Sequence, residues 1–263
     1  MNEALDRVLE RPPSWFTRFV KNTGRGINEF EMIGGNDRII LGVSGGKDSL
    51  ALALALSYRK RWLPIDYTLH GIMIDWIEYP LGDRARKALE EFFDRIDVEL
   101  TVTRAHMHSE SFQGEFNCYL CSRNRKRILF ERAGDLKISK IALGHHLDDI
   151  VETTLINLCF RGQFATMMPV QEFFGGKLRI IRPLCKVRET EVDKVVGRLE
   201  LPVYEVGCPY KETNIRARMK PVVRELARMD KQVREHIFSA HTNIVEGYSG
   251  FDSIRPKNHD EPP

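Results

Sequence analysis

The chain has 263 residues, of which 42% are hydrophobic, enough to build the core of one large domain or of two small ones. Lys and Arg (40) only slightly outnumber Asp and Glu (37), and a formal charge of +3 does not by itself indicate a nucleic-acid partner. The charged first residues lack an apolar signal segment and no apolar run approaches the ~20 residues of a membrane span, so we expect a cytoplasmic protein without a membrane anchor.

Segments of strand character alternate with segments of helical length along most of the chain. Strands are expected at residues 38–43, 68–74, 98–103, 140–143 and 178–181. Helices are expected at residues 14–33, 50–56, 83–95, 189–199 and 215–246. This alternation predicts an α/β fold, a Rossmann-like parallel sheet with helices on both faces and helical additions at both ends.

The same pattern divides the chain into four parts. We expect an N-terminal helical segment at residues 1–35, the sheet domain at 36–210 and a C-terminal helical region at 211–249. Residues 250–263 contain three Pro and no periodicity, which is typical of a disordered tail.

A glycine-rich loop joins the first expected strand to the helix after it. Free N–H groups and the dipole at a helix N-terminus attract anions, and adjacent glycines let the backbone approach them closely. A lysine in the loop adds positive charge, so we expect the loop to bind phosphate. Its residues are Ser44, Gly45, Gly46, Lys47, Asp48 and Ser49.

This loop does not follow the Walker pattern of enzymes that transfer a γ-phosphate. Only three residues separate Gly42 from Gly46, and Asp48 stands where Ser or Thr would ligate Mg²⁺. The loop instead resembles the pyrophosphate-binding loop of the PP-loop ATP pyrophosphatases, the adenine nucleotide alpha hydrolase-like fold. The resemblance implies that ATP is cleaved between its α- and β-phosphates, so that a substrate oxygen is adenylated and then displaced by a nucleophile.

Three cysteines are candidates for a metal or cluster site. Cys118 and Cys121 project on one face if their segment is helical, and Cys208 follows the last strand-like run, where a doubly wound fold places its site. Three thiolates are one short of the four that iron–sulfur clusters usually take from protein. A structural zinc site completed by His145 or His146 is the alternative. Of the remaining two, Cys159 is expected in the core, and Cys185 is expected to be inert, with a persulfide carrier as the alternative.

Three further segments narrow the resemblance. Residues 118–130 (CYLCSRNRKRILF), 143–169 (LGHHLDDIVETTLINLCFRGQFATMMP) and 179–189 (RIIRPLCKVRE) follow the loop in this order. Over residues 15–248 the chain resembles the tRNA 2-thiocytidine synthetases, an iron–sulfur branch of the PP-loop enzymes. The resemblance implies a [4Fe–4S] cluster on Cys118, Cys121 and Cys208, with a fourth iron that carries sulfide. The single Cys of GCPY is more similar to the tRNA 2-thiouridine synthetases, which makes uridine the second candidate base.

Carboxylates at the ends of two expected strands are candidates for the reaction. Asp148 and Asp149 follow Gly144 and His145, and one of them can cap the next helix while the other ligates Mg²⁺ or accepts a proton. We favour Asp149 for the chemistry. The resemblance places this motif, with its Gly and His, beside the nucleotide at the catalytic centre, together with Asp48. Asp75 is placed to touch the ribose or adenine, or else is a plain turn residue.

Basic residues flank two of the three cysteine positions. Arg125, four residues after Cys121, matches a basic position of the family, which implies a place facing the ATP phosphates. The neighbouring positive charges are either a solvated face or a contact for RNA phosphates. They are Arg123, Lys126 and Arg127, and after Cys208 Arg216, Arg218, Lys220, Arg224 and Arg228.

Together these features predict an ATP-dependent tRNA thiolase. A pyrimidine O2 attacks the α-phosphorus of ATP, pyrophosphate leaves into the loop, and sulfur displaces AMP. An unpaired cytidine in the anticodon loop is the expected target, and sulfide or a cysteine desulfurase system is the expected sulfur donor. We also expect a homodimer. Two other readings stay open: an ATP-dependent amine ligase with a structural zinc, and a non-enzymatic nucleotide-binding redox sensor.

Overall fold

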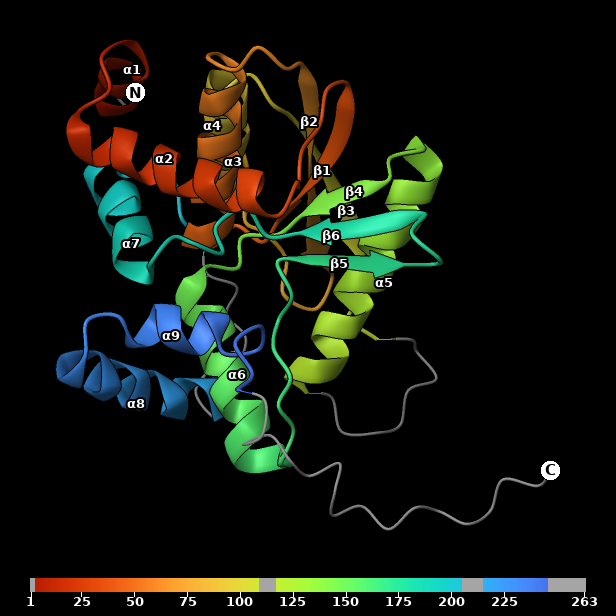
Figure 1. Ribbon diagram of the computed structural model, residues 1–263. Coiled ribbons are helices and arrows are strands. Elements are labelled where there is room, and N and C mark those ends of the chain that lie inside the picture. Colours follow the sequence, from red (N-terminus) through yellow and green to blue (C-terminus); the bar gives the residue numbers. More distant parts are fainter. Residues whose placement is uncertain (1–2, 109–116, 205–214, 246–263) are drawn as a thin grey trace.

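The computed structural model describes residues 3–108, 117–204 and 215–245, and within them the centre of the molecule is a six-stranded sheet (Figure 1). The strand order is β3-β2-β1-β4-β6-β5, and all neighbours are parallel except the antiparallel hairpin of β5 and β6. The predicted α/β fold with a parallel sheet is therefore confirmed. The strands are β1 (Asp37–Val43), β2 (Tyr67–Trp76), β3 (Glu99–Ala105), β4 (Lys140–Ala142), β5 (Val170–Phe173) and β6 (Leu178–Ile181).

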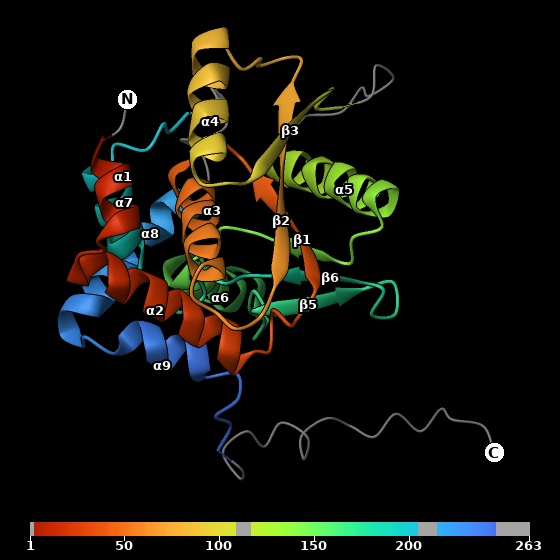
Figure 2. The ribbon, with the colours of Figure 1, turned by 90° about the horizontal axis from the view of Figure 1, so that it is seen from above.

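Helices cover both faces of the sheet (Figure 2). Helices α3 and α4 lie on one face with the N-terminal helices outside them, whereas α5 lies on the other face. Helices α8 and α9 pack against α6. The helices are α1 (Glu3–Glu10), α2 (Ser14–Glu29), α3 (Lys47–Lys60), α4 (Asp83–Arg95), α5 (Cys118–Leu136), α6 (Leu147–Arg161), α7 (Glu189–Arg198), α8 (Ile215–Met229) and α9 (Val233–Ser239).

Local signals account for most of these elements and for the places where prediction missed. Strand β5 was missed because it is short and only half-buried; its hairpin turn uses Gly175 and Gly176, both with positive φ. The single helix expected at 215–246 is two helices, since the side chain of Asp230 accepts the N–H of Gln232 in a turn between them. Helix α2 ends before residue 33 because Glu31 adopts a left-handed φ of 47°.

Each face of the sheet has its own core. Under α5, isoleucines of β1, β2, β4 and β6 pack against Ile128 and Leu129. On the opposite face the core includes the fully buried Leu and Ala residues 50–56 of α3, which accounts for the lack of an amphipathic pattern there. Phe16 of α2 and Phe238 of α9 belong to this second core, so both terminal helical segments are packed onto the sheet domain.

The domain boundaries expected at residues 35, 210 and 249 stay a prediction. The tail expected at 250–263 lies outside the described residues.

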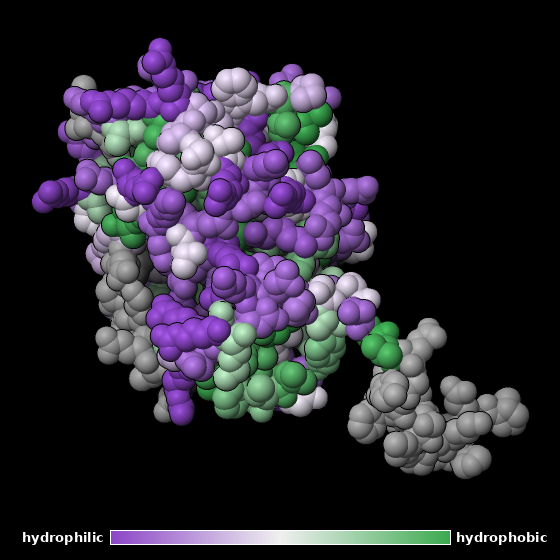
Figure 3. Space-filling model, turned by 60° about the vertical axis from the view of Figure 1, so that its left-hand side comes forward, coloured by the Kyte–Doolittle hydropathy of each residue, from purple (hydrophilic) through white to green (hydrophobic). Residues whose placement is uncertain are grey.

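The surface on the side of the N-terminal helices is largely hydrophilic (Figure 3). Among the described residues, no helix is long and apolar enough to cross a membrane.

Candidate active site

The glycine-rich loop lies between the end of β1 and the start of α3, and two serines hold its shape. Gly45 has a φ of 78°, which favours glycine, and Gly46 is the N-cap of α3. The Ser49 hydroxyl accepts the N–H of Ser44 at 3.2 Å and donates to the carbonyl of Gly46 at 2.8 Å. The Ser44 hydroxyl accepts the N–H of Gly46 at 3.2 Å. The loop is therefore a closed turn at a helix N-terminus, as a phosphate site requires.

The Lys47 side chain contacts α7, and its role in phosphate binding stays a prediction. Its ammonium group donates to Glu189 at 2.8 Å and to Asp193 at 2.5 Å, both on α7, and the side chain does not line the cavity described next. Burial alone would lower the pKa of Lys47, but the hydrogen bonds with Asp193 and Glu189 raise it above its usual value. In this structure the lysine joins the loop to α7.

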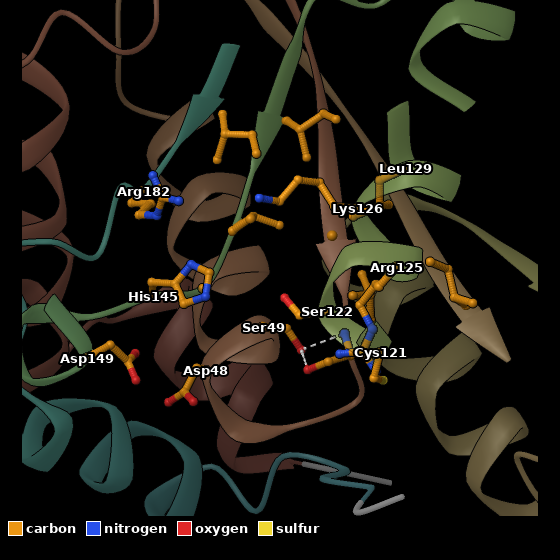
Figure 4. A pocket seen from close by; sticks show the side chains of 18 of the residues that line it. Asp48, Ser49, Cys121, Ser122, Arg125, Lys126, Leu129, His145, Asp149 and Arg182 are labelled. Atoms are coloured by element: carbon orange, nitrogen blue, oxygen red, sulfur yellow. Dashed lines mark hydrogen bonds between the residues drawn. The ribbon is translucent and has the colours of Figure 1, made fainter. Parts of the chain in front are cut away.

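A cavity of about 510 Å³ opens where β1, β4 and β6 end, between the sheet and α5 (Figure 4). This volume suits a small-molecule ligand. Isoleucines of the strands and Leu129 of α5 form its apolar part. The polar lining brings together residues that are far apart in sequence: Ser44, Asp48, Ser49, Cys121, Ser122, Arg125, Lys126, Gly144, His145, Asp149, Arg182 and Arg216.

Gly144 lies where the strand β4 meets the first turn of α3. A Cβ atom at this position would lie 2.8 Å from the carbonyl carbon and oxygen of Asp48 and 2.9 Å from the Ser49 nitrogen. Only glycine allows so close an approach of two backbones. The residue was predicted to bind the cofactor; the structure shows that it lines the cavity and sets the distance between β4 and the loop.

The two neighbouring aspartates have different surroundings. Asp149 and His146 form a capping box at the start of α6, in which the Asp149 N–H donates to His146 Nδ1 and Asp149 Oδ2 accepts the His146 N–H. Asp149 also lines the cavity. Asp148 is buried, accepts the Glu189 N–H and contacts Arg234 of α9 at 2.5 Å. The structure thus gives Asp149 both the cap and the cavity, and turns Asp148 towards α7 and α9.

The pKa of Asp48 is raised and the pKa of His145 is lowered. Burial, and then the charge of Asp149, raise the pKa of Asp48 to about 6, although His146 Nε2 lies 3.6 Å from its carboxylate. Burial, with the positive charges of Arg182 and Arg216, lowers the pKa of His145 to about 4. His145 is therefore a neutral imidazole at pH 7, and Asp48 is a carboxylate that gains a proton in mild acid.

Three polar atoms of the cavity residues are buried without a hydrogen-bond partner in the described part of the chain. They are Asp48 Oδ1, His145 Nδ1 and Arg182 Nε. Buried polar groups are normally satisfied, so this set indicates a place where a ligand supplies the partners. Figure 4 shows Arg182 and Lys126 on opposite sides of the cavity, with Asp48 and Asp149 together at the other end.

Arg125 lines the cavity, and its guanidinium carbon lies 5.9 Å from the centre of the Trp76 ring. Its place facing the ATP phosphates stays a prediction. Arg182 was not predicted as a site residue. The available signal was its position immediately after β6, at the carboxyl end of a parallel strand. Its Nη1 donates to the Met168 carbonyl, and burial lowers its pKa to about 10.

Asp75 makes its hydrogen bonds outside the cavity. Its carboxylate is only 3% exposed, accepts the Leu81 N–H at 2.6 Å and pairs with Arg86 at 2.8 Å. It does not line the cavity, although its neighbour Ile74 does. Asp75 therefore orders the loop after β2, which agrees with the turn alternative.

The candidate cluster ligands are only partly within the described residues. Cys118 is the first residue of α5, Cys121 lies one turn further and lines the cavity, and Cys208 lies outside the described residues. Where side chains are described, no group of three or more His, Cys, Asp or Glu is arranged to hold a metal ion. The three-cysteine site stays a prediction.

The other two cysteines, Cys159 and Cys185, do not line the cavity. Cys185 is fully buried against Gly26, and burial raises the pKa of its thiol to about 12, which fits an inert thiol. Cys159 was expected in the core, but it is exposed in the last turns of α6. That expectation was wrong because this end of α6 extends past the sheet (Figure 1).

Comparison with known proteins places the chain in a family. Residues 17–223 match the PP-loop domain family. The tRNA-cytidine(32) 2-sulfurtransferase of Burkholderia multivorans is 32% identical over 89% of this chain and 71% of its own length, and that of Paraburkholderia phytofirmans is 32% identical over 89% and 70%. The structure of the U34-tRNA thiolase NcsA from Methanococcus maripaludis, solved with its [4Fe-4S] cluster, shares the fold with a TM-score of 0.67, 22% identity and coverage of 85% and 78%. The chain belongs to the PP-loop family of ATP pyrophosphatases that includes the tRNA-cytidine(32) 2-sulfurtransferases.

Proposed function

We propose that this protein is an ATP-dependent tRNA thiolase that converts a cytidine of the anticodon loop to 2-thiocytidine. The observation that carries the proposal is the shared cavity, in which the phosphate-binding loop and Cys121 line one space. The relatives named as tRNA-cytidine(32) 2-sulfurtransferases support cytidine 32 as the target.

The reaction replaces one atom in two displacements. The O2 of cytidine attacks the α-phosphorus of ATP, and the bond to pyrophosphate breaks. A sulfide sulfur then attacks C2, and the C2–O bond breaks, so that AMP leaves with the original oxygen. Net consumption is one ATP and one sulfide for each base.

The residues of the cavity fit the first displacement. Ser44, Ser49 and the N-terminus of α3 stabilise the departing pyrophosphate, as helix N-termini do for anions. Arg125 and Arg182 neutralise charge that develops at the α-phosphate. Asp48 and Asp149 hold Mg²⁺ or take up a proton, since carboxylate oxygens are what Mg²⁺ prefers and the pKa of Asp48 lies near 6.

Cys118 and Cys121 fit the thiolate ligands of an iron–sulfur cluster, because they occupy the first turn of one helix and Cys121 lines the cavity. Cys208 completes the proposed set. When bound, a [4Fe–4S] cluster held by these cysteines would carry the sulfide for transfer to the base. Sulfide or a cysteine desulfurase system is the proposed donor, and a homodimer the proposed assembly.

Anaerobic reconstitution with iron and sulfide, followed by incubation with ATP and unmodified tRNA, tests this function. Mass analysis of the digested tRNA should show 2-thiocytidine in amounts that match the AMP released. The Cys208→Ala variant should give none. A tRNA pool without any thiolated nucleoside would overturn the proposal, and 2-thiouridine in place of 2-thiocytidine would change the assigned base.

A further inference from the structure

The cavity that contains the glycine-rich loop, Cys121 and Arg125 is called the nucleotide cavity below. A second hollow lies on the other side of α5 from it. Its volume is about 910 Å³, and it runs between the carboxyl end of β3 and α5. Helix α5 lines both spaces, with Cys121 and Arg125 on the cavity side and Arg123 and Arg127 on the far side. We call this second space the β3–α5 groove. The residues that line it are Thr103–Ala105, His106, His108, Leu120, Arg123, Asn124, Arg127, Ile128, Glu131, Arg132 and Asp135.

The groove carries an excess of positive charge. Its four arginines outnumber its two carboxylates. Arg127 pairs with Glu131 at 2.5 Å and Arg132 with Asp135 at 3.4 Å. Arg104 and Arg123 are exposed and make no ion pair with any residue of the described ranges. These two guanidinium groups are therefore available to an anionic ligand.

The inner wall of the groove is polar as well. Thr103 is 9% exposed, and its hydroxyl has no hydrogen-bond partner within the described part of the chain. Its apolar lining is small, with Ile128 buried and Leu120 only partly exposed. Protein partners are usually held by exposed aromatic or aliphatic anchors, which this lining does not offer. A ligand with many anionic oxygens fits the groove better.

The groove and the nucleotide cavity meet at the first turns of α5. Asn117 and Cys121 line the cavity, whereas Leu120 and Arg123 line the groove. A helix with its side chains is only ~10 Å wide, so a strand held in the groove passes close to the mouth of the cavity. Enzymes that act on unpaired bases hold the backbone in a basic channel and turn the base into a pocket.

We propose that the β3–α5 groove binds the phosphodiester backbone of the RNA whose base enters the cavity across the first turn of α5. The inference rests on the proposed function, because it assigns the place of the tRNA at the same site. Arg104 and Arg123 bind phosphates directly, whereas Arg127 and Arg132 are already paired with Glu131 and Asp135.

The test compares two double variants of the full chain. Arg104→Gln with Arg123→Gln removes the two arginines without an ion pair, and Arg61→Gln with Arg84→Gln removes two exposed arginines outside the groove. Affinity for unmodified tRNA is measured by fluorescence anisotropy from 50 to 300 mM KCl, and ATP affinity and thermal unfolding are measured alongside. We expect the groove variant to bind tRNA roughly tenfold more weakly at low salt, with a salt slope reduced by about 1.4 to 1.8 for two phosphates. ATP affinity, unfolding and the control variant should match the wild type.

Wild-type affinity and salt slope in the groove variant would overturn the inference. A second outcome would also overturn it: the groove variant binds tRNA as the wild type does, but loses thiolation when a partner protein delivers the sulfur and keeps it with free sulfide. The groove would then be a docking surface for that protein. Thiolation by the wild-type protein on the same tRNA separates the two proposals. Groove-dependent binding without thiolation overturns the proposed function alone, and thiolation with groove-independent binding overturns this inference alone.

Discussion

The Lys47 ammonium and the Glu189 carboxylate lie 2.8 Å apart and join the phosphate-binding loop to the start of α7. Lys220 of α8 contacts the same carboxylate oxygen at 2.7 Å. One half-buried carboxylate therefore holds together the loop, α7 and the C-terminal helices. Burial would raise the pKa of Glu189, but the hydrogen bonds from Lys220 and Lys47 lower it to about 2.

Glu189→Gln tests this connection. The folded pKa of Glu189 lies below its ordinary value, so its ion pairs stabilise the fold fully above about pH 4.5 and are lost as the pH falls towards 2. We expect the variant to lose about 1–2 kcal/mol of unfolding free energy at pH 7 and much less at pH 3, measured by urea denaturation. An equal loss at both pH values would contradict the ion-pair account.

Arg182 is expected to contribute to function at the expense of stability. It is 5% exposed, and no carboxylate pairs with it among the described residues. An unpaired buried charge is costly, so Arg182→Gln should leave the free energy of unfolding unchanged or raise it. The same variant should lower kcat/KM for thiolation by roughly a hundredfold, because it removes a positive charge from the proposed site of the reacting phosphate. Partial recovery of kcat/KM in Arg182→Lys would assign the loss of activity to the missing charge. A lower free energy of unfolding in Arg182→Gln would contradict the prediction that this arginine costs stability.

Glu152 should make the protein less stable as the pH rises. Burial, and then the charge of Asp149, raise the pKa of Glu152 to about 7, and its Oε2 is buried without a hydrogen-bond partner within the described ranges. The folded state therefore binds the proton more tightly, and the free energy of unfolding falls between about pH 4.5 and 7. Glu152→Gln should reduce this fall by on the order of 1 kcal/mol, measured as the difference in urea midpoint between pH 5 and pH 8. Asp48, whose pKa is raised to about 6, contributes to the loss of stability over the same pH range. The control is Glu90→Gln at an exposed position, which should leave the difference between pH 5 and pH 8 unchanged.

Gly144 and Gly134 form a matched pair of glycines for substitution. A Cβ at position 144 would meet the backbone of Asp48 and Ser49, whereas a Cβ at position 134 in α5 would meet nothing within 4 Å. Gly144→Ala should lower the free energy of unfolding by about 1–3 kcal/mol and weaken ATP binding, because the loop must shift. Gly134→Ala should raise it by about 0.5–1 kcal/mol, as alanine does in a helix. Calorimetry measures unfolding and ATP binding for both variants. Equal effects of the two substitutions would contradict the close contact of Gly144 with the backbone of Asp48 and Ser49.

The role of Cys121 can be separated from that of the nucleotide site. Cys121→Ala should abolish the visible absorbance of the reconstituted protein and 2-thiocytidine formation, since it removes a proposed cluster ligand. ATP affinity should stay within about a factor of three, because the loop that binds phosphate is untouched. Cys159→Ala, on the exposed end of α6, is the control and should behave as wild type. Full thiolation by Cys121→Ala would exclude this residue from the cluster.

Prediction from sequence succeeded where the signal is local. The strands β1, β2, β3, β4 and β6 were expected within about three residues, and the bounds of α4 were expected correctly. Helix α4 has its apolar residues on one stripe, and the strands are short apolar runs, so neighbouring residues decide their structure. The exposed Cys159 was misjudged because burial in the second half of α6 depends on where the sheet ends, which no local pattern reports.

By itself, the sequence determined the α/β architecture, the glycine-rich loop and the order of the motifs, because hydrophobic periodicity, glycine and the strand-to-helix junction act over a few residues. Only the tertiary structure decided which side chains face the cavity. Lys47 and Glu189 are 142 residues apart, and Arg182 and His145 come from different strand ends. Their positions follow from the packing of α7 on α3 and of β6 beside β4, and such long-range contacts leave no signal in the residues on either side.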